Sequence, residues 1–358
     1  MRNFVLLAFC LVAPVAAAPD PAALAVMGRV ARYQLAHPSP ERFDSWQQGT
    51  FLAGLSALDR AAADLQVHEA LLRIGEGNAW TPGPSVYLAD DLCVAQAYLE
   101  LNGANGDPSR IAAVRTRCDF ILAHPKTGPI DFTAPGGTDR WSWCDALFMA
   151  APVWVRLSDA TGQARYRDFA VKEWWAASDR LYDPAERLFF RDKTFLARRE
   201  GNGAKVFWGR GEGWAFAALA RVLDCLPADH PSRPLFIRQF REMAERLGGL
   251  QQSDGSWCPS LLAPEAYSPK RESSATGLIC YGLAWGVNQR ILDQGTYGPA
   301  VRKAWRALVE CVTPEGRLTF VQPQGKGPKS FDPANTEAYG VGAFLLAGSE
   351  VCRLAGPR

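Results

Sequence analysis

The chain has 358 residues, of which 48% are hydrophobic and 21% are charged, a balance that supports a sizeable buried core. Lys and Arg number 39 against 37 Asp and Glu, so the formal net charge is only +2. This near balance argues against a nucleic-acid partner, which would require a basic excess. The twelve Trp residues supply flat apolar rings that suit the faces of sugars, although we expect about half of them to lie in the core.

The first 18 residues are predicted to be a signal peptide. Arg2 gives a positive start, residues 4–15 are mostly apolar, and residues 15–18 are small enough for cleavage. The apolar stretch is too short to span a membrane, and no later segment is long and uncharged enough. We therefore expect an exported bacterial protein, periplasmic or secreted, with one mature domain over residues 19–358.

The cysteines and histidines give no metal-binding pattern. Eight Cys follow the leader without any CxxC pair, so we expect most of them to be small buried side chains, with room for one or two disulfides after export. The four His show no ligand spacing. The sequence predicts neither a metal nor a cofactor.

Apolar residues recur at helical spacing along the mature chain. Val301, Trp305 and Leu308, for example, form one buried stripe of an amphipathic helix. By this criterion we predict helices near residues 20–37, 44–60, 62–75, 87–103, 107–123, 143–160, 163–182, 213–226, 231–250, 272–291, 296–312 and 334–355.

Turn-rich breaks separate these helices, and several end in aromatic or extended apolar residues, as short β-hairpins do. Their regular recurrence indicates a repeated pair of helices that must stack on its neighbours. We predict an all-α ring of six helical hairpins around a central cavity; an open solenoid with a groove is the alternative. The breaks lie at residues 75–80, 127–132, 183–190, 253–257 and 313–320.

The segment RWSWCDALFMAAPVW, residues 140–154, contains the first candidate for chemistry, Asp145. A carboxyl group among Trp, Cys, Leu and Phe loses hydration, which raises its pKa as a general acid requires. Pro152 fits best in the first turn of a helix, which places Asp145 at or just before the helix start. The alternative is an N-cap aspartate that binds backbone amides and stays ionised.

Three alternating glycines mark the segment FWGRGEGW, residues 207–214. This alternation disfavours a helix and lets the backbone approach a ligand closely. Arg210 can grip a carboxylate through two parallel hydrogen bonds, and Trp208 and Trp214 can stack on a sugar. The alternative is a glycine-rich turn with a surface pair between Arg210 and Glu212.

Two further segments carry acidic residues at helix starts. Asp90 and Asp91 are adjacent, so at most one of them is expected to face a cavity, and capping explains one. Glu272 precedes a run of Ser and Thr, where capping is the simpler explanation.

Together these segments resemble the unsaturated rhamnogalacturonyl hydrolases of glycoside hydrolase family 105, which are similar to unsaturated glucuronyl hydrolases. The resemblance runs from about Phe43 to Leu354. It rests on the WCDALFM run, the FWGRGxGW loop, the SDGxW turn and the SATGLICYGLAWG helix, of which the first two are quite specific. It implies an (α/α)6 barrel, in agreement with the six predicted hairpins.

The resemblance also implies a mechanism based on hydration of a double bond. The substrate sugar is a uronic acid with a C4=C5 double bond, at the non-reducing end of a lyase-generated oligosaccharide. Asp145 would protonate C4 and then deprotonate the water that attacks C5. The resulting hemiketal opens and expels the rest of the chain, whereas ordinary glycosidases are attacked at C1.

By position, the resemblance assigns binding roles to aromatic and arginine side chains. Asp90 or Asp91, preferably Asp90, would be the second acidic residue, which binds ring hydroxyls or raises the pKa of Asp145. The wall and clamp of the sugar subsite would be Trp208, Arg210 and Trp214, with Trp46 and Trp143 as further lining residues.

Two positions depart from the family pattern. Arg191 stands where some members have His, and could bind an anionic neighbouring sugar. Glu212 replaces the more usual Asn, and a carboxylate beside Arg210 could weaken the clamp. Rhamnose from pectic rhamnogalacturonan is the first choice for the neighbouring sugar; ulvan, arabinogalactan and glycosaminoglycan fragments are alternatives.

Other functions stay open at this stage. A polysaccharide lyase or a sugar epimerase could use the same barrel, although the scattered His argue against an epimerase. The non-enzymatic alternative is an oligosaccharide-binding protein. We expect a monomer or a weak oligomer.

Overall fold

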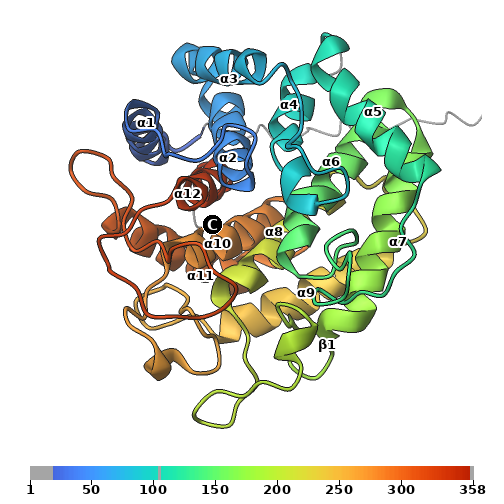
Figure 1. The fold of residues 1–358 in the computed structure, drawn as a ribbon. Coiled ribbons are helices and arrows are strands. Elements are labelled where there is room, and N and C mark those ends of the chain that lie inside the picture. The colour runs from blue at the N-terminus through green and yellow to red at the C-terminus, as the bar shows by residue number, and fades with distance from the viewer. Residues whose placement is uncertain (1–18, 104–105, 355–358) are drawn as a thin grey trace, which may run out of the picture.

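The computed structural model describes residues 19–103 and 106–354, and its regular structure is almost entirely helical (Figure 1). The predicted signal peptide lies outside these residues. No helix within them is long and apolar enough to cross a bilayer. The α-helices are α1 (Pro21–Ala36), α2 (Trp46–Ala62), α3 (Leu65–Gly77), α4 (Ala95–Asn102), α5 (Ser109–Ala123), α6 (Asp145–Thr161), α7 (Ala164–Leu181), α8 (Gly209–Cys225), α9 (Arg233–Gly249), α10 (Ser273–Asn288), α11 (Gln294–Glu310) and α12 (Ala338–Val351).

The even-numbered helices form a closed inner ring, and the odd-numbered helices cover it from outside (Figure 1). Each inner helix packs on the next one in chain order, and α12 packs on α2 to close the ring. Helices α3, α5, α7, α9 and α11 each pack on the inner helix before them, while α1 covers α12 and α2. The predicted (α/α)6 barrel is confirmed, and the contact between α12 and α2 excludes the open solenoid.

The ring closes through a glycine contact between α2 and α12. A Cβ atom on Gly54 would lie 2.5 Å from the carbonyl oxygen of Gly342. A Cβ atom on Gly342 would lie 2.2 Å from the carbonyl oxygen of Thr50. Because both neighbours are backbone atoms of close-packed helices, any larger residue would push the two helices apart.

Side-chain caps fix the starts of two inner helices. Ser45 accepts a hydrogen bond from the Gln48 amide at the start of α2. Glu272 accepts hydrogen bonds from the amides of Ser274 and Ala275 at the start of α10. These bonds satisfy amides that have no partner within the helix. The predicted capping role of Glu272 is confirmed.

The expectation for Pro152 is wrong, although α6 does begin at Asp145. Pro152 lies inside α6 rather than in its first turn. Because proline has no amide hydrogen, the Phe148 carbonyl four residues earlier loses its helical donor. The buried side chain of Gln96 donates to that carbonyl at 2.8 Å instead, which allows the helix to continue.

The alternating glycines do not break a helix, contrary to expectation. Helix α8 begins at Gly209, before the predicted start at residue 213. A Cβ atom on Gly209 would lie 2.1 Å from the Cys258 carbonyl oxygen, and one on Gly213 would lie 2.9 Å from Cβ of Leu278. These glycines therefore permit close packing of α8 on its neighbours rather than the approach of a ligand.

One of the predicted β-hairpins is a two-stranded sheet. Strands β1 (Tyr182–Asp183) and β2 (Leu188–Phe189) pair antiparallel within the break at 183–190. In the other breaks the described residues form at most isolated bridges, such as Val312 with Leu318. The connections also contain the 3-10 helices η1 (Ala89–Leu92), η2 (Lys193–Phe195) and η3 (Pro264–Ala266).

The predicted helix over residues 87–103 is divided into η1 and α4. The eight Cys of the mature chain are all free thiols, and all except the half-buried Cys225 are buried. The expectation of small buried cysteines is therefore confirmed.

Candidate active site

Inner helices α2, α6 and α8 begin beside one another at one end of the ring, around a cavity of about 370 Å³. The unpaired amides and dipoles of helix starts favour negative charge at such a place. Seven of the nine sequence-predicted site residues line this cavity, and Asp91 and Trp214 do not. The lining residues are Trp46, Leu88, Asp90, Phe132, Thr138, Trp143, Asp145, Met149, Arg191, Trp208, Arg210, Gln324, Gly325 and Lys326.

Asp145 is the first residue of α6, and its side chain is only 13% exposed. The cap position is Cys144, which makes no side-chain cap bond. Among side chains, the Cys144 thiol donates to the Asp145 carboxylate at 3.5 Å. Loss of hydration raises the pKa of Asp145, and the positive charges of Arg191 and Arg210 lower it. Asp145 is therefore a desolvated carboxyl group rather than an N-cap.

Arg191 is the cation next to Asp145. Its Nε lies 3.7 Å from the Asp145 carboxylate and makes no hydrogen bond in the described structure. Its Nη1 donates to Asp192 at 2.5 Å, and its guanidinium lies over the ring of Phe132. Strand β2 delivers this residue to the cavity, and the Arg191 carbonyl accepts a hydrogen bond from the Cys144 amide. Arg191 is thus held beside Asp145 from both its backbone and its side chain.

Asp90 and Asp91 point to different surroundings. Asp90 lines the cavity, and burial together with the nearby charges of Asp145 and Asp91 raises its pKa to about 7. Asp91 accepts a hydrogen bond from the Ser85 amide at 2.7 Å and packs against Gly83. The expectation that at most one of the two faces a cavity is met, and Asp91 instead fixes the loop before η1.

Arg210 and Trp208 form one wall of the cavity. The Arg210 guanidinium lies over the Trp208 ring, 4.5 Å from its centroid, and over the ring of Tyr339. Its Nη1 donates to the carbonyl of Gln322 and its Nη2 to that of Pro323. Part of the expected two-bond clamp is therefore occupied by protein carbonyls.

Trp214 lies behind this wall rather than in it. It is 1% exposed and packs edge-on against Trp46, with ring centroids 6.1 Å apart, and against Phe148. Its predicted contact with the sugar is not supported, because side chains of the inner helices cover it. Trp46 and Trp143, in contrast, reach the cavity directly.

Glu212 does not pair with Arg210, contrary to both predictions made for it. It is fully buried on α8, and its two carboxylate oxygens share the amide of Phe189 at 2.9 and 3.0 Å. Burial holds the pKa of Glu212 well above its usual range. Because Phe189 belongs to β2, Glu212 anchors the strand that carries Arg191.

The sequence reasoning missed the connection between α11 and α12 as part of the site. Gln324, Gly325 and Lys326 line the cavity mouth, and the Lys326 ammonium lies 5.3 Å from the Phe132 ring centroid. The signal was the irregular, Gly- and Lys-rich segment directly before the last inner helix. Such a segment forms a loop, and a loop at this end of the ring must lie near the helix starts.

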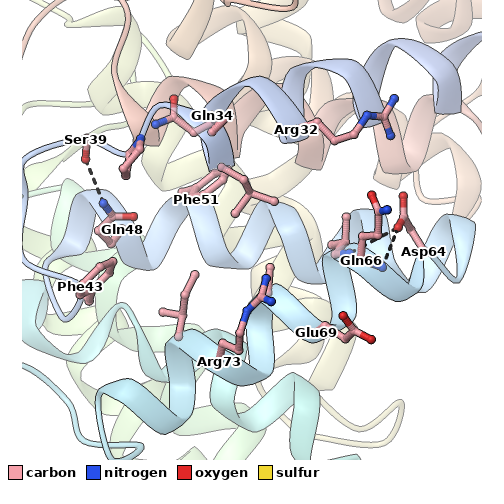
Figure 2. A pocket seen from close by; sticks show the side chains of 16 residues that line it. Arg32, Gln34, Ser39, Phe43, Gln48, Phe51, Asp64, Gln66, Glu69 and Arg73 are labelled. Atoms are coloured by element: carbon pink, nitrogen blue, oxygen red, sulfur yellow. Dashed lines mark hydrogen bonds between the residues drawn. The ribbon is translucent and has the colours of Figure 1, made fainter.

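A second cavity, of about 630 Å³, lies outside the ring between α1, α2 and α3 (Figure 2). Figure 2 shows the side chain of Gln48 hydrogen-bonded to Ser39, and the Asp64 carboxylate, which accepts a hydrogen bond from the backbone amide of Gln66. Asp64 is the N-cap of α3, so this carboxylate has a structural role. None of the sequence-predicted site residues lines this groove. Within the described residues, no cluster of His, Cys, Asp and Glu could hold a metal ion.

The profile described as Glycosyl Hydrolase Family 88 matches residues 22–355. The chain belongs to glycosyl hydrolase family 88. This family confirms that the protein is a glycoside hydrolase, and it agrees with the enzyme class indicated by the sequence. Two relatives named unsaturated 3S-rhamnoglycuronyl hydrolase come from Formosa agariphila and an Alteromonas species. They are 37% and 36% identical, over 92% and 86% of this chain and 90% and 77% of theirs.

Solved structures share the fold over nearly the whole chain. A family 88 glycosyl hydrolase from Bacteroides vulgatus has a TM-score of 0.85 at 28% identity, covering 93% of this chain and 98% of its own. A structure described as a polysaccharide lyase has a TM-score of 0.84 at 30% identity, covering 93% and 97%. The fold is therefore shared with proteins named for two different activities.

Replacing Arg191 tests the electrostatic balance at Asp145. A glycoside hydrolase needs a protonated acid, so its activity falls as the pH rises through the pKa of that acid. Because the Arg191 charge lowers the pKa of Asp145, Arg191→Gln should raise this pKa and move the alkaline limb of the pH–rate profile to higher pH. Arg191→Lys, which keeps the charge, is the control. An alkaline limb that stays in place or moves to lower pH would contradict the interaction between Arg191 and Asp145.

Proposed function

We propose that this enzyme removes a 4,5-unsaturated uronic acid from the non-reducing end of lyase-generated oligosaccharides. The observation that carries this proposal is the pair of desolvated carboxyl groups, Asp90 and Asp145, facing two guanidinium groups in one cavity. Burial raises the pKa of both carboxyl groups, which favours the protonated form that a proton donor needs, and the guanidinium groups favour an anionic sugar. The indole rings of Trp46, Trp143 and Trp208 supply surfaces for a sugar ring.

The unsaturated sugar suits a proton donor of this kind. Its C4=C5 double bond is conjugated with the ring oxygen and therefore rich in electrons at C4. Transfer of a proton from Asp145 to C4 leaves positive charge shared between C5 and the ring oxygen. The Asp145 carboxylate then takes a proton from a water molecule that attacks C5. The hemiketal opens by breaking the bond between C5 and the ring oxygen, and the hemiacetal left at C1 releases the remaining oligosaccharide.

Asp90 supports this step as the partner of Asp145 in a coupled pair. Two interacting carboxyl groups lose their protons in two steps that belong to the pair rather than to either residue. Burial raises the pKa of Asp90 to about 7, with a further contribution from the Asp145 charge, so the pair binds a proton at pH values below neutral and releases it near pH 7. We assign the transfer to Asp145 because the positive charges of Arg191 and Arg210 both favour its ionised form and so stabilise the carboxylate left after donation.

The lyase alternative requires a different arrangement of groups. A lyase removes the proton at C5 with a base and creates the double bond, whereas the proposed hydrolase consumes it. Of the described residues that line the cavity, none is a histidine or tyrosine, and the only lysine, Lys326, is exposed at the mouth. The similarity to a protein described as a lyase makes the direction of the absorbance change the decisive observation.

For the neighbouring sugar, we propose rhamnose that carries, or adjoins, a further negative charge. The relatives from Formosa and Alteromonas are named for rhamnoglycuronyl substrates, and one from Bacillus subtilis, 25% identical over 59% of this chain, for rhamnogalacturonyl substrates. Lys326 provides an exposed cation at the mouth of the cavity. Both ulvan-type and pectic fragments fit this description.

We also propose that the protein is exported. The signal-like residues 1–18 support this proposal. Fractionation of the producing cells would locate the mature chain.

Asparagine variants of the aspartates test the assignment. Asp145→Asn should lower kcat about 10²–10⁴-fold, because it removes the proton donor while keeping the shape of the side chain. Asp91→Asn is the matched control and should retain most of the turnover, since its remaining oxygen can still accept from Ser85. The assay follows the ultraviolet absorbance of the double bond, which falls on hydration. An increase in absorbance on an intact polysaccharide would identify a lyase, and equal loss in both variants would exclude the special role of Asp145.

Lys326→Met tests the second anionic group. This change should raise KM about tenfold for a disaccharide with a charged neighbouring sugar, the size of effect expected from losing a charged hydrogen bond. It should leave KM nearly unchanged for the matching uncharged disaccharide. Equal KM values for wild type and variant on both substrates would remove Lys326 from the substrate contacts.

A further inference from the structure

Gln322 connects two parts of the cavity that are distant in sequence. It is fully buried, directly before the loop of residues 323–327. On one side of Gln322 lie Trp208 and Arg210, which belong to the inner wall of the cavity. The loop lies on its other side, and the exposed Gln324 and Lys326 stand at the mouth.

The side-chain amide of Gln322 uses both of its ends to hold these parts. Its Oε1 accepts a hydrogen bond from the indole Nε1 of Trp208 at 3.0 Å. Its Nε2 donates to the carbonyl of Gly327 at 2.8 Å. A primary amide offers an acceptor and a donor in fixed directions, so one side chain sets the distance between wall and loop.

The backbone of Gln322 is also fully used. Its carbonyl accepts hydrogen bonds from Arg210 at 2.5 Å and from the Tyr339 hydroxyl at 2.6 Å. Its amide donates to the carboxylate of Glu272 at 3.1 Å. Because Glu272 also caps α10, the position of Gln322 is fixed to the inner ring.

We propose that Gln322 is a positioning residue for substrate binding, and that its two side-chain bonds serve two different subsites. The bond to Trp208 fixes the wall that contacts the unsaturated uronate. The bond to Gly327 fixes the loop that contacts the neighbouring sugar. Among the described residues, Gln322 makes no hydrogen bond to Asp90 or Asp145, so the role concerns affinity rather than proton transfer. This inference rests on the proposed function, which identifies the substrate as an unsaturated oligosaccharide.

Two substitutions separate the two bonds. Gln322→Met keeps the size of the side chain and loses both hydrogen bonds. Gln322→Glu keeps an oxygen that accepts from Trp208, but a carboxylate has no hydrogen to donate to Gly327. The two substrates are an unsaturated disaccharide and the methyl glycoside of the same unsaturated uronate, which has no neighbouring sugar.

We expect Gln322→Met to raise KM about tenfold on both substrates, with kcat within about threefold of wild type. Gln322→Glu should raise KM for the disaccharide alone and leave the methyl glycoside at the wild-type value. The matched control is Gln251→Met, which removes two hydrogen bonds from a glutamine side chain to the carbonyls of Gly255 and Ala300, away from the cavity. It should lower the melting temperature without changing KM.

Wild-type KM values in both Gln322 variants would overturn the inference, as would a fall in kcat at constant KM. If Gln322→Met does not fold, Gln322→Glu decides: an unchanged KM for the disaccharide, or equal increases on both substrates, would contradict the division between wall and loop. These outcomes require an active wild-type enzyme. Absence of turnover by wild type on every unsaturated substrate would instead overturn the proposed function itself, and the inference with it.

Discussion

The proposed chemistry depends on removing two carboxyl groups from water beside a small number of positive charges. Burial raises the pKa of Asp90 and of Asp145, and the guanidinium groups of Arg191 and Arg210 act against this rise at Asp145. Without burial both groups would be ionised at neutral pH and could not donate a proton. Without the arginines the carboxylate left after donation would be unstable in such a site, and an anionic sugar would be repelled.

The helical ring produces this environment through its connections. The chemistry-bearing residues lie at or just before the starts of inner helices, while the helices themselves provide a dry, rigid interior. Glycine contacts between α2 and α12 close the ring, and the bond from Glu212 to Phe189 anchors the strand that presents Arg191. Gln322 then joins the wall formed by Trp208 to the loop at the mouth. Each of these residues acts on the site through another residue rather than by contact with substrate.

The sequence predicted the fold well because helical periodicity and repeated breaks follow from local rules. It also predicted that Asp145, Arg210 and their neighbouring indoles meet in one cavity. It failed where tertiary contacts decide. The alternating glycines of α8 predicted a loop, because the neighbouring sequence does not indicate that Cys258 packs closely against Gly209. Trp214 and Trp208 have the same local character, and only packing buries one behind the wall. The role proposed for Gln322 depends on a bond to Trp208, 114 residues away in the chain, which no local pattern indicates.

In the proposed function, the substrate is selected by two layers of positive charge: the arginines inside the cavity and Lys326 at its mouth. The most direct test of the shared proton is a ¹³C NMR titration of the Asp carboxyl groups in the free enzyme, with signals assigned by Asp90→Asn and Asp145→Asn. We predict that the pair still holds one proton at pH 6 and releases it with an apparent pKa of about 7. Two carboxyl groups that both titrate near the ordinary Asp value of about 3.9 would contradict the account.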